Sequence, residues 1–309
     1  MGYFQLSQEE ERKMKKTRTL LGTALLLINC MTVAKAAENS NTQYAPGASQ
    51  FYAGAIPPFE GFYFLSQTSY FTANRVNDGK GREIPIDFKV KATVETLRFM
   101  YVSDIRIGEA QLWGQLVLPL IHLDISNAFA KDSGFNMGDA TATVGLSWHP
   151  DQKQTFITGI DIGMPTGAYD ENALANAGLN HWSVQPTIAY HYSDPQGLEF
   201  ATAARVIFNS ENTATDYKTG NEFVLDYAVG WNFGKIRVGA TGYYLKQFTD
   251  DKGPGVASDG HRGEGLAVGP SLSYSFNPGL GISASWQHDV VAKNRSEGNT
   301  LWVNVATKF

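Results

Sequence analysis

Hydrophobic and polar residues alternate with a period of two over most of the chain. In residues 301–309, Leu301, Val303 and Val305 alternate with residues such as Asn304. Successive side chains of a β-strand point to opposite faces, so this pattern predicts a strand with one apolar face and one small or polar face. The pattern predicts an all-β protein.

Twelve segments of this kind can be counted after residue 60. Most run for ten to sixteen residues, whereas a strand of a soluble sheet usually has about five or six. A tilted strand needs about nine to eleven residues to cross a bilayer. The segments are 61–74, 87–102, 107–120, 138–149, 154–165, 181–193, 198–209, 221–233, 235–249, 264–275, 280–289 and 300–309.

The predicted connections alternate between short turns and long loops, as in outer-membrane barrels, where tight turns face the periplasm and longer loops face outward. Aromatic residues such as Trp231 and Phe276 cluster near the strand ends, which is typical of aromatic girdles. We therefore predict an antiparallel up-and-down transmembrane barrel over residues 61–309. The expected turns are 103–106, 150–153, 194–197, 234 and 277–279, and the expected loops are 75–86, 121–137, 166–180, 210–220, 250–263 and 290–299.

The N-terminal residues 1–36 have the three parts of a secretory signal. A basic cluster from Arg12 to Arg18 precedes an apolar stretch from Leu20 to Val33, and Ala34-Lys35-Ala36 forms a small-residue cleavage site. Met14 is an alternative start to Met1. At the other end, Phe309 closes an alternating strand, which resembles the signal read by the barrel-assembly machinery. These features place the chain in the outer membrane of a Gram-negative bacterium.

Residues 37–60 form a segment of their own before the first strand. Asn39 to Gln50 is polar, and Gly54 to Pro58 is stiffer. This segment is too short for a folded plug domain. Two interpretations remain open, a disordered periplasmic tail and a peptide that enters the barrel and gates it.

Composition narrows the function. Charged residues make up 18% of the 309 residues and the net charge is -5, so electrostatics give no support for a nucleic-acid partner. The six histidines show no metal-ligand spacing, and no cofactor is expected. His181 and Ser183 share a strand face, a spacing that suits a base and a nucleophile, but that face is the polar one, away from lipid. We therefore predict a channel, not an enzyme.

If the apolar faces meet lipid, polar side chains line the lumen. Asp161, Gln185, Arg205 and Asp226 then fall near mid-height, with Arg237 on a neighbouring strand, and they are candidates for a charged constriction. The alternative is a network of paired charges that fills a narrow barrel. Apolar residues that would suit a hydrophobic entrance lie in the predicted outer loops, namely Leu123, Ile125, Phe129, Leu174 and Leu179.

Several short stretches resemble the bacterial family of the MetA pathway of phenol degradation, a group of outer-membrane barrels. They are Ala55 to Pro58 with Gly61 and Tyr63, Arg98 to Tyr101, Met164 to Tyr169, and Asn176 to Tyr190. The resemblance covers roughly residues 50–309. It implies passive uptake of small hydrophobic or aromatic compounds and brings no established site residue.

Two other functions remain open at this point. One is a general or ion-selective porin for polar solutes, and the other is a closed barrel that uses its outer loops as a contact surface. Porin trimers usually have more strands, which favours a monomer here.

Overall fold

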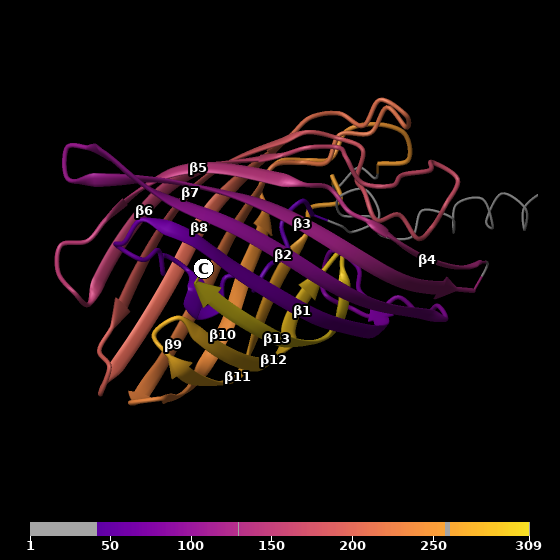
Figure 1. The fold of residues 1–309 in the computed structure, drawn as a ribbon. Coiled ribbons are helices and arrows are strands. Elements are labelled where there is room, and N and C mark those ends of the chain that lie inside the picture. Colours follow the sequence, from indigo (N-terminus) through magenta and orange to yellow (C-terminus); the bar gives the residue numbers. More distant parts are fainter. Residues whose placement is uncertain (1–41, 129, 257–259, 309) are drawn as a thin grey trace, which may run out of the picture. The chain divides into compact units, whose positions relative to one another are not determined.

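A closed antiparallel β-barrel forms the part of the chain that the computed structural model describes, residues 42–128, 130–256 and 260–308 (Figure 1). The predicted signal sequence, Phe129 and Phe309 lie outside the described residues. None of the helices found in the described residues is long and apolar enough to span a membrane.

The barrel has twelve strand positions around its wall, as the sequence predicted. Except between β4 and β5, each strand pairs with the next in the chain, and β1 pairs with both β2 and β13, which closes the ring. β4 and β5 both pair with β3 and share one position, interrupted at residues 138–140. The strands are β1 (Gly61–Val76), β2 (Phe88–Ile107), β3 (Ala110–Asn127), β4 (Lys131–Met137), β5 (Thr141–Trp148), β6 (Gln154–Gly163), β7 (Ser183–Ser193), β8 (Leu198–Asn209), β9 (Glu222–Phe233), β10 (Ile236–Gln247), β11 (Glu264–Asn277), β12 (Leu280–Lys293) and β13 (Ser296–Lys308).

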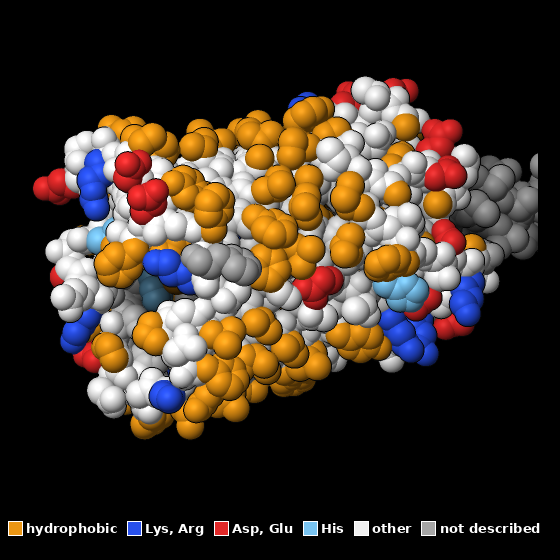
Figure 2. All heavy atoms as spheres, in the orientation of Figure 1, with side chains coloured by type: hydrophobic (Ala, Val, Ile, Leu, Met, Phe, Trp, Pro, Cys, Tyr) orange, Lys and Arg blue, Asp and Glu red, His pale blue; other side chains and the backbone are white. Residues whose placement is uncertain are grey.

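Alternation sorts the side chains between the two faces of the wall. On β9, Val229 and Trp231 are about half exposed, whereas Asp226 and Ala228 are buried. Figure 2 shows the result on one side of the barrel, where hydrophobic side chains cover the middle and charged ones gather at the two ends. This is the surface of a barrel that faces lipid.

Three predicted connections are wrong in position. Residues 121–137 were expected to form a loop, but β3 runs on to Asn127 and turns tightly into β4. Residues 290–299 are likewise mostly strand, and β2 continues through the expected turn at 103–106 to Ile107. The backbone ladder continues beyond the lipid band, where nothing requires an apolar outer face, so these extensions read as loops in the sequence.

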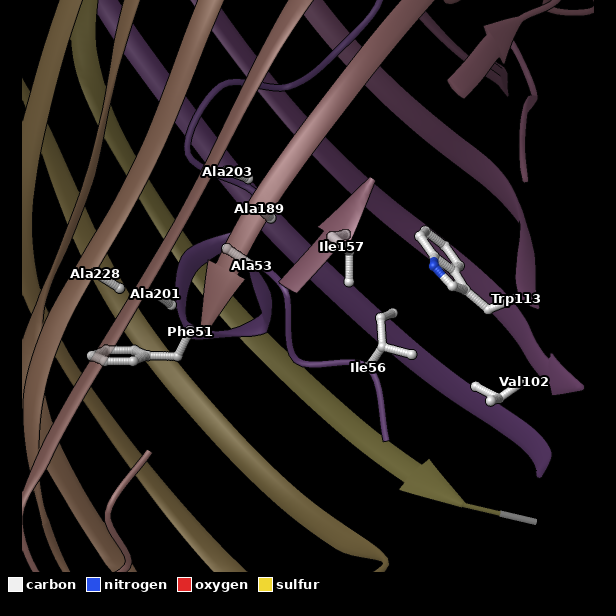
Figure 3. Packing of buried hydrophobic residues seen from close by; sticks show 10 residues of the cluster. All are labelled: Phe51, Ala53, Ile56, Val102, Trp113, Ile157, Ala189, Ala201, Ala203 and Ala228. Carbon is white, nitrogen blue, oxygen red and sulfur yellow. The ribbon is translucent and has the colours of Figure 1, made fainter. Parts of the chain in front are cut away.

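Residues 42–56 lie inside the barrel. They include one short 3-10 helix, η2 (Gln50–Tyr52), and they pack into two buried clusters with the inner wall. In the first, Phe51, Ala53 and Ile56 contact wall residues such as Trp113 and Ile157 (Figure 3). In the second, Tyr44 and Ala48 pack among residues of the wall. We call residues 42–56 the lumen segment.

Candidate functional site: the occupied lumen

The predicted mid-lumen residues fall into one hydrogen-bonded network. Asp161 on β6 is paired in register with Gln185 on β7. Arg205 on β8 reaches across and donates from Nη1 to Asp161 Oδ2 at 2.9 Å and to Gln185 Oε1 at 3.3 Å. All three side chains are buried. Three strands thus place one ion pair and one amide at the same level of the lumen.

Asp226, the fourth predicted residue, binds the lumen segment instead of another wall residue. Its Oδ1 accepts the backbone N–H of Gly47 at 2.8 Å, and its Oδ2 accepts that of Ser49 at 2.9 Å and the hydroxyl of Tyr44. A buried carboxylate with three donors is well compensated for its loss of water. Gly47 has a φ of +85°, a conformation that favours glycine and that turns its N–H toward Asp226.

Arg205 and Asp226 are linked through Tyr44. The guanidinium carbon of Arg205 lies 3.5 Å from the centre of the Tyr44 ring, and the hydroxyl of that ring bonds Asp226. The four predicted residues therefore belong to one cluster, but the tyrosine that connects them comes from the lumen segment.

A second contact of the same type lies two strands further on. Arg237 on β10 forms an ion pair with Glu199 on β8, and its guanidinium carbon is 3.8 Å from the centre of the Phe51 ring. Glu199 also accepts from Asn232 at 2.8 Å and lies 3.0 Å from His191 Nε2. Two arginines of the wall thus each hold one aromatic residue of the lumen segment.

The segment runs the height of the barrel. Residue 60 precedes β1 at the end with the short turns, while Thr42 donates to Glu222 at 2.8 Å at the other end. There Gln43 donates to Asp139 at 3.1 Å and to the carbonyl of His181 at 3.0 Å. In between, Gln67 of β1 donates to the carbonyl of Ala48 at 2.8 Å. The wall therefore binds the segment along its whole length.

Sequence reasoning missed Tyr44 and Phe51, because nothing in a short polar segment shows that its aromatic residues meet arginines of distant strands. It also missed Arg98 on β2, although a signal was present. Phe99 and Tyr101 are exposed on the outer face. Side chains alternate between the two faces of a strand, so Arg98, which precedes Phe99, must point inward. A cavity of about 60 Å³ lies between Arg98 and the lumen segment.

The apolar entrance candidates lie on different elements. Leu123 and Ile125 belong to the extension of β3, not to a loop, and pair with Ala92 and Val90 on β2. Leu174 is in the expected loop, and its backbone N–H donates to Asp132 of β4 at 3.0 Å. The N–H of Leu179 donates to Asp139 at 2.8 Å. The loop therefore bonds to the β4 and β5 edge of the wall, and an entrance role for these residues stays a prediction.

His181 and Ser183 are both buried and do not face lipid. His181 Nε2 lies 3.3 Å from Asn209 Oδ1, and the Ser183 hydroxyl accepts from Gln185 at 2.9 Å. Each side chain is thus engaged in the hydrogen-bond network of the lumen.

The outer loops after β8 and β10 bind each other through a buried acid. Asp251 accepts the backbone N–H of Gly220 and the amide of Gln247, both at 2.7 Å, and the hydroxyl of Tyr217 at 2.5 Å. Burial raises the pKa of Asp251 above its ordinary value, although these donors act in the opposite direction. The cluster lies outside the lipid band and holds the loops together over the barrel.

These features define the class of the protein: an outer-membrane β-barrel with its lumen occupied by its own N-terminal residues. A family model described as "Putative MetA-pathway of phenol degradation" matches residues 73–305. The chain belongs to this family, as the sequence motifs indicated.

A solved structure has the same fold. The COG4313 outer membrane channel from Pseudomonas putida F1 superposes with a TM-score of 0.74 at 17% identity, over 86% of this chain and all of that one. The beta domain of the Bordetella autotransporter BrkA (TM-score 0.49, 11% identity, 81% and 100% coverage) and the CymD monoaromatic hydrocarbon channel (0.46, 10%, 83% and 90%) match more loosely. No curated protein matches the sequence.

Proposed function

We propose that this barrel is a channel for passive entry of small hydrophobic or aromatic compounds across the outer membrane. The observation that carries the proposal is the apolar inner wall behind the lumen segment. Val102, Trp113 and Ile157 face inward there, together with alanines of β7, β8 and β9, and Phe51 and Ile56 cover them. The interior of a porin is usually polar, so an apolar stretch inside the barrel suits an apolar solute.

The lumen segment acts in this proposal as a gate. It occupies the space that a solute needs, and it is held to the wall by hydrogen bonds, by two cation–ring contacts and by two buried clusters. Withdrawal of residues 42–56 would uncover the apolar wall and the Asp161–Arg205 pair together. That pair, with Asp226, would then form the narrow charged level of the open path. The proposal involves no cofactor and no catalytic step.

Two supports come from the relatives. The family description refers to phenol degradation, and the Pseudomonas putida F1 protein of the same fold is called an outer membrane channel. We propose in addition that the strand β13 with Phe309 is the part of the chain that the barrel-assembly machinery recognises.

The filled lumen favours a second candidate, a closed barrel that serves as a scaffold for its outer loops. The network around Asp226 and the interlocked loops at Asp251 are the features expected of such a barrel. This candidate predicts that no solute crosses.

Solute flux into liposomes that contain the refolded barrel separates these functions. The panel contains toluene, benzyl alcohol, benzoate and sugars of graded size, with leak through empty liposomes subtracted. The channel proposal expects faster entry of the aromatic compounds with sugars excluded. Flux of sugars graded by size would identify a general porin, and no flux above leak would identify a closed barrel.

A further inference from the structure

The cavity beside the lumen segment has an unusual set of polar groups. It measures about 60 Å³ and lies between residues 49–56 of the segment and the inner faces of β2, β3, β5, β6, β7 and β8. Arg98, Trp113, Asp161 and Arg205 are among the residues that line it. Because the lining comes from six strands and from the lumen segment, the closed barrel and the segment together build the site.

Two buried donors at this cavity have no hydrogen-bond partner in the described part of the chain. They are Nε of Arg98 and Nε1 of Trp113. Figure 3 shows the indole nitrogen of Trp113 on the side of the ring that faces Ile56 and Ile157, toward the interior. Buried donors nearly always have a partner, so the two unpaired groups indicate a missing acceptor.

Asp161, the carboxylate that lines the cavity, does not accept a hydrogen bond from Arg98 or Trp113. Asp161 Oδ1 accepts from Thr143 at 2.5 Å, and its Oδ2 accepts from Thr187 at 3.2 Å and from Arg205 at 2.9 Å. Both oxygens are therefore engaged. The second carboxylate of this network, Asp226, accepts from Gly47, Ser49 and Tyr44 of the lumen segment, so neither acid is hydrogen-bonded to Arg98 or Trp113.

An acceptor with one negative charge fits this arrangement. A carboxylate has two oxygens, donates nothing when ionised, and meets an arginine with charge-assisted hydrogen bonds. A neutral hydrocarbon would leave both donors unpaired. The rest of the lining combines the polar side chains of Ser49, Gln115, Thr143 and Thr187 with the apolar ones of Ile56 and Ile157 and the face of Trp113, and this apolar part suits an aromatic ring next to the carboxylate.

We propose that this cavity binds the carboxylate of a small aromatic acid, with Arg98 and Trp113 as its donors. The inference rests on the proposed function, since it names the solute class of the same lumen. A cavity that binds benzene has about 150 Å³, so the present space holds the carboxylate, and the ring enters as Tyr52 and Ile56 give way. Binding of the acid and docking of the lumen segment therefore oppose each other.

The test measures benzoate binding to the refolded barrel in detergent by isothermal titration calorimetry, with benzyl alcohol as the neutral analogue. The wild type should bind benzoate and not benzyl alcohol. Arg98→Gln should weaken benzoate binding at least about ten-fold, and Trp113→Phe, which removes only the indole donor, should weaken it less. Arg106→Gln is the matched control, because Arg106 lies on the same strand with its side chain exposed.

Folding is checked by the heat-dependent shift of the barrel on gels, and Arg98→Lys provides a second variant that keeps the charge but loses the paired donors. Equal benzoate binding by wild type and Arg98→Gln would overturn the proposal, as would equal binding of benzyl alcohol. Absence of benzoate binding in a barrel that still transports toluene would mean a cavity that holds water only, with the channel function intact. Absence of all aromatic flux would instead refute the proposed function.

Discussion

The guanidinium carbon of Arg205 lies 3.5 Å from the centre of the Tyr44 ring, although the two residues are far apart in the chain. Tyr44 also bonds Asp226, so one side chain of the lumen segment contacts a cation and an anion of the wall together. A cation over a desolvated ring contributes about 2 kcal/mol. This tyrosine is therefore a main anchor of the segment.

Tyr44→Phe should loosen the segment without moving the wall. The substitution keeps the ring over Arg205 and removes one of three donors to the buried Asp226, a loss of about 1–3 kcal/mol. Hydrogen exchange of the backbone amides of Gly47 and Ser49 should then be faster, by about ten-fold for each 1.4 kcal/mol. Tyr70→Phe is the control, because Tyr70 is 41% exposed on the outer face. Equal exchange in both variants would show that the hydroxyl does not anchor the segment.

Phe51→Ala should weaken the other anchor. The Phe51 side chain is 2% exposed and packs under Arg237 and against the inner wall. Truncation of a buried phenylalanine costs about 3–5 kcal/mol. Here the loss mostly weakens docking of the lumen segment, and the barrel itself keeps its stability. Single-channel conductance should rise, while Phe59→Ala, at a residue 66% exposed, should leave it unchanged. A conductance like that of the wild type would show that Phe51 does not keep the path closed.

Deletion of residues 37–52 should raise conductance more than either single substitution. The deletion removes Tyr44, Phe51 and all donors to Asp226, while the hydrogen-bond ladder of the twelve wall positions stays complete. Planar bilayer recordings measure the effect. An unaltered conductance in a correctly folded deletion variant would count against a gate.

Arg205→Ala and Asp226→Ala should change ion selectivity in opposite directions. Loss of Arg205 leaves Asp161 without its ion pair and favours cations, and loss of Asp226 favours anions. Reversal potentials in a salt gradient measure both. The hypothesis of a charged constriction would be abandoned if neither variant differed from the wild type.

The outer loops should pack more firmly in mild acid. Burial raises the pKa of Asp251, so the packed loops bind a proton more readily than the opened ones. The resulting stabilisation is complete below the ordinary pKa of 3.8 and is lost as the pH rises through the raised value. Protease cleavage within 210–221 and 248–263 should therefore slow down on acidification with an acid-stable protease, after correction for its own pH profile. Asp251→Asn should remove this dependence, and a variant with the same pH profile as wild type would contradict the assignment.

The barrel itself could be predicted because lipid imposes a period of two on every strand that crosses it. Trp231 and Asp226 show this rule on one strand, and their burial follows it. Alternation of apolar and polar residues is required only within the lipid band. The sequence therefore predicted loops at β4 and at the tips of β3 and β12. Their ladders are held by backbone hydrogen bonds, which leave little trace in the sequence.

Of the residues that form the site, only those on the barrel wall could be predicted from the sequence. Inward alternation placed Asp161, Gln185, Arg205 and Asp226 in the lumen, and three of them bond directly. What Asp226 binds could not be derived, because its partners Gly47 and Ser49 are backbone donors of a segment with no periodicity. A φ of +85° at Gly47 depends on tertiary contacts that no local pattern records.

The central claim is that solutes pass through the lumen only when the lumen segment moves. A reversible disulfide between the segment and β7 tests it directly. A Cβ built on Gly54 lies 3.3 Å from the Cβ of His191, close to the range of about 3.5–4.5 Å found in disulfides. Gly54 has a φ of +70°, and the added Cβ also lies 3.0 Å from the carbonyl carbon of Tyr190, so the segment must shift by a few tenths of an ångström to accept the cysteine. Cys30 is the one cysteine of the sequence and precedes the predicted cleavage site, so no other thiol interferes after processing.

The measurement is aromatic flux through Gly54→Cys/His191→Cys barrels in liposomes, oxidised and then reduced, with each single variant as a control. We expect the oxidised form to show no flux of toluene or benzoate above the leak through empty liposomes, and the reduced form to admit both at the rate of the single variants. Equal flux before and after reduction, with the disulfide confirmed by mass spectrometry, would contradict the account and place the solute path outside the segment.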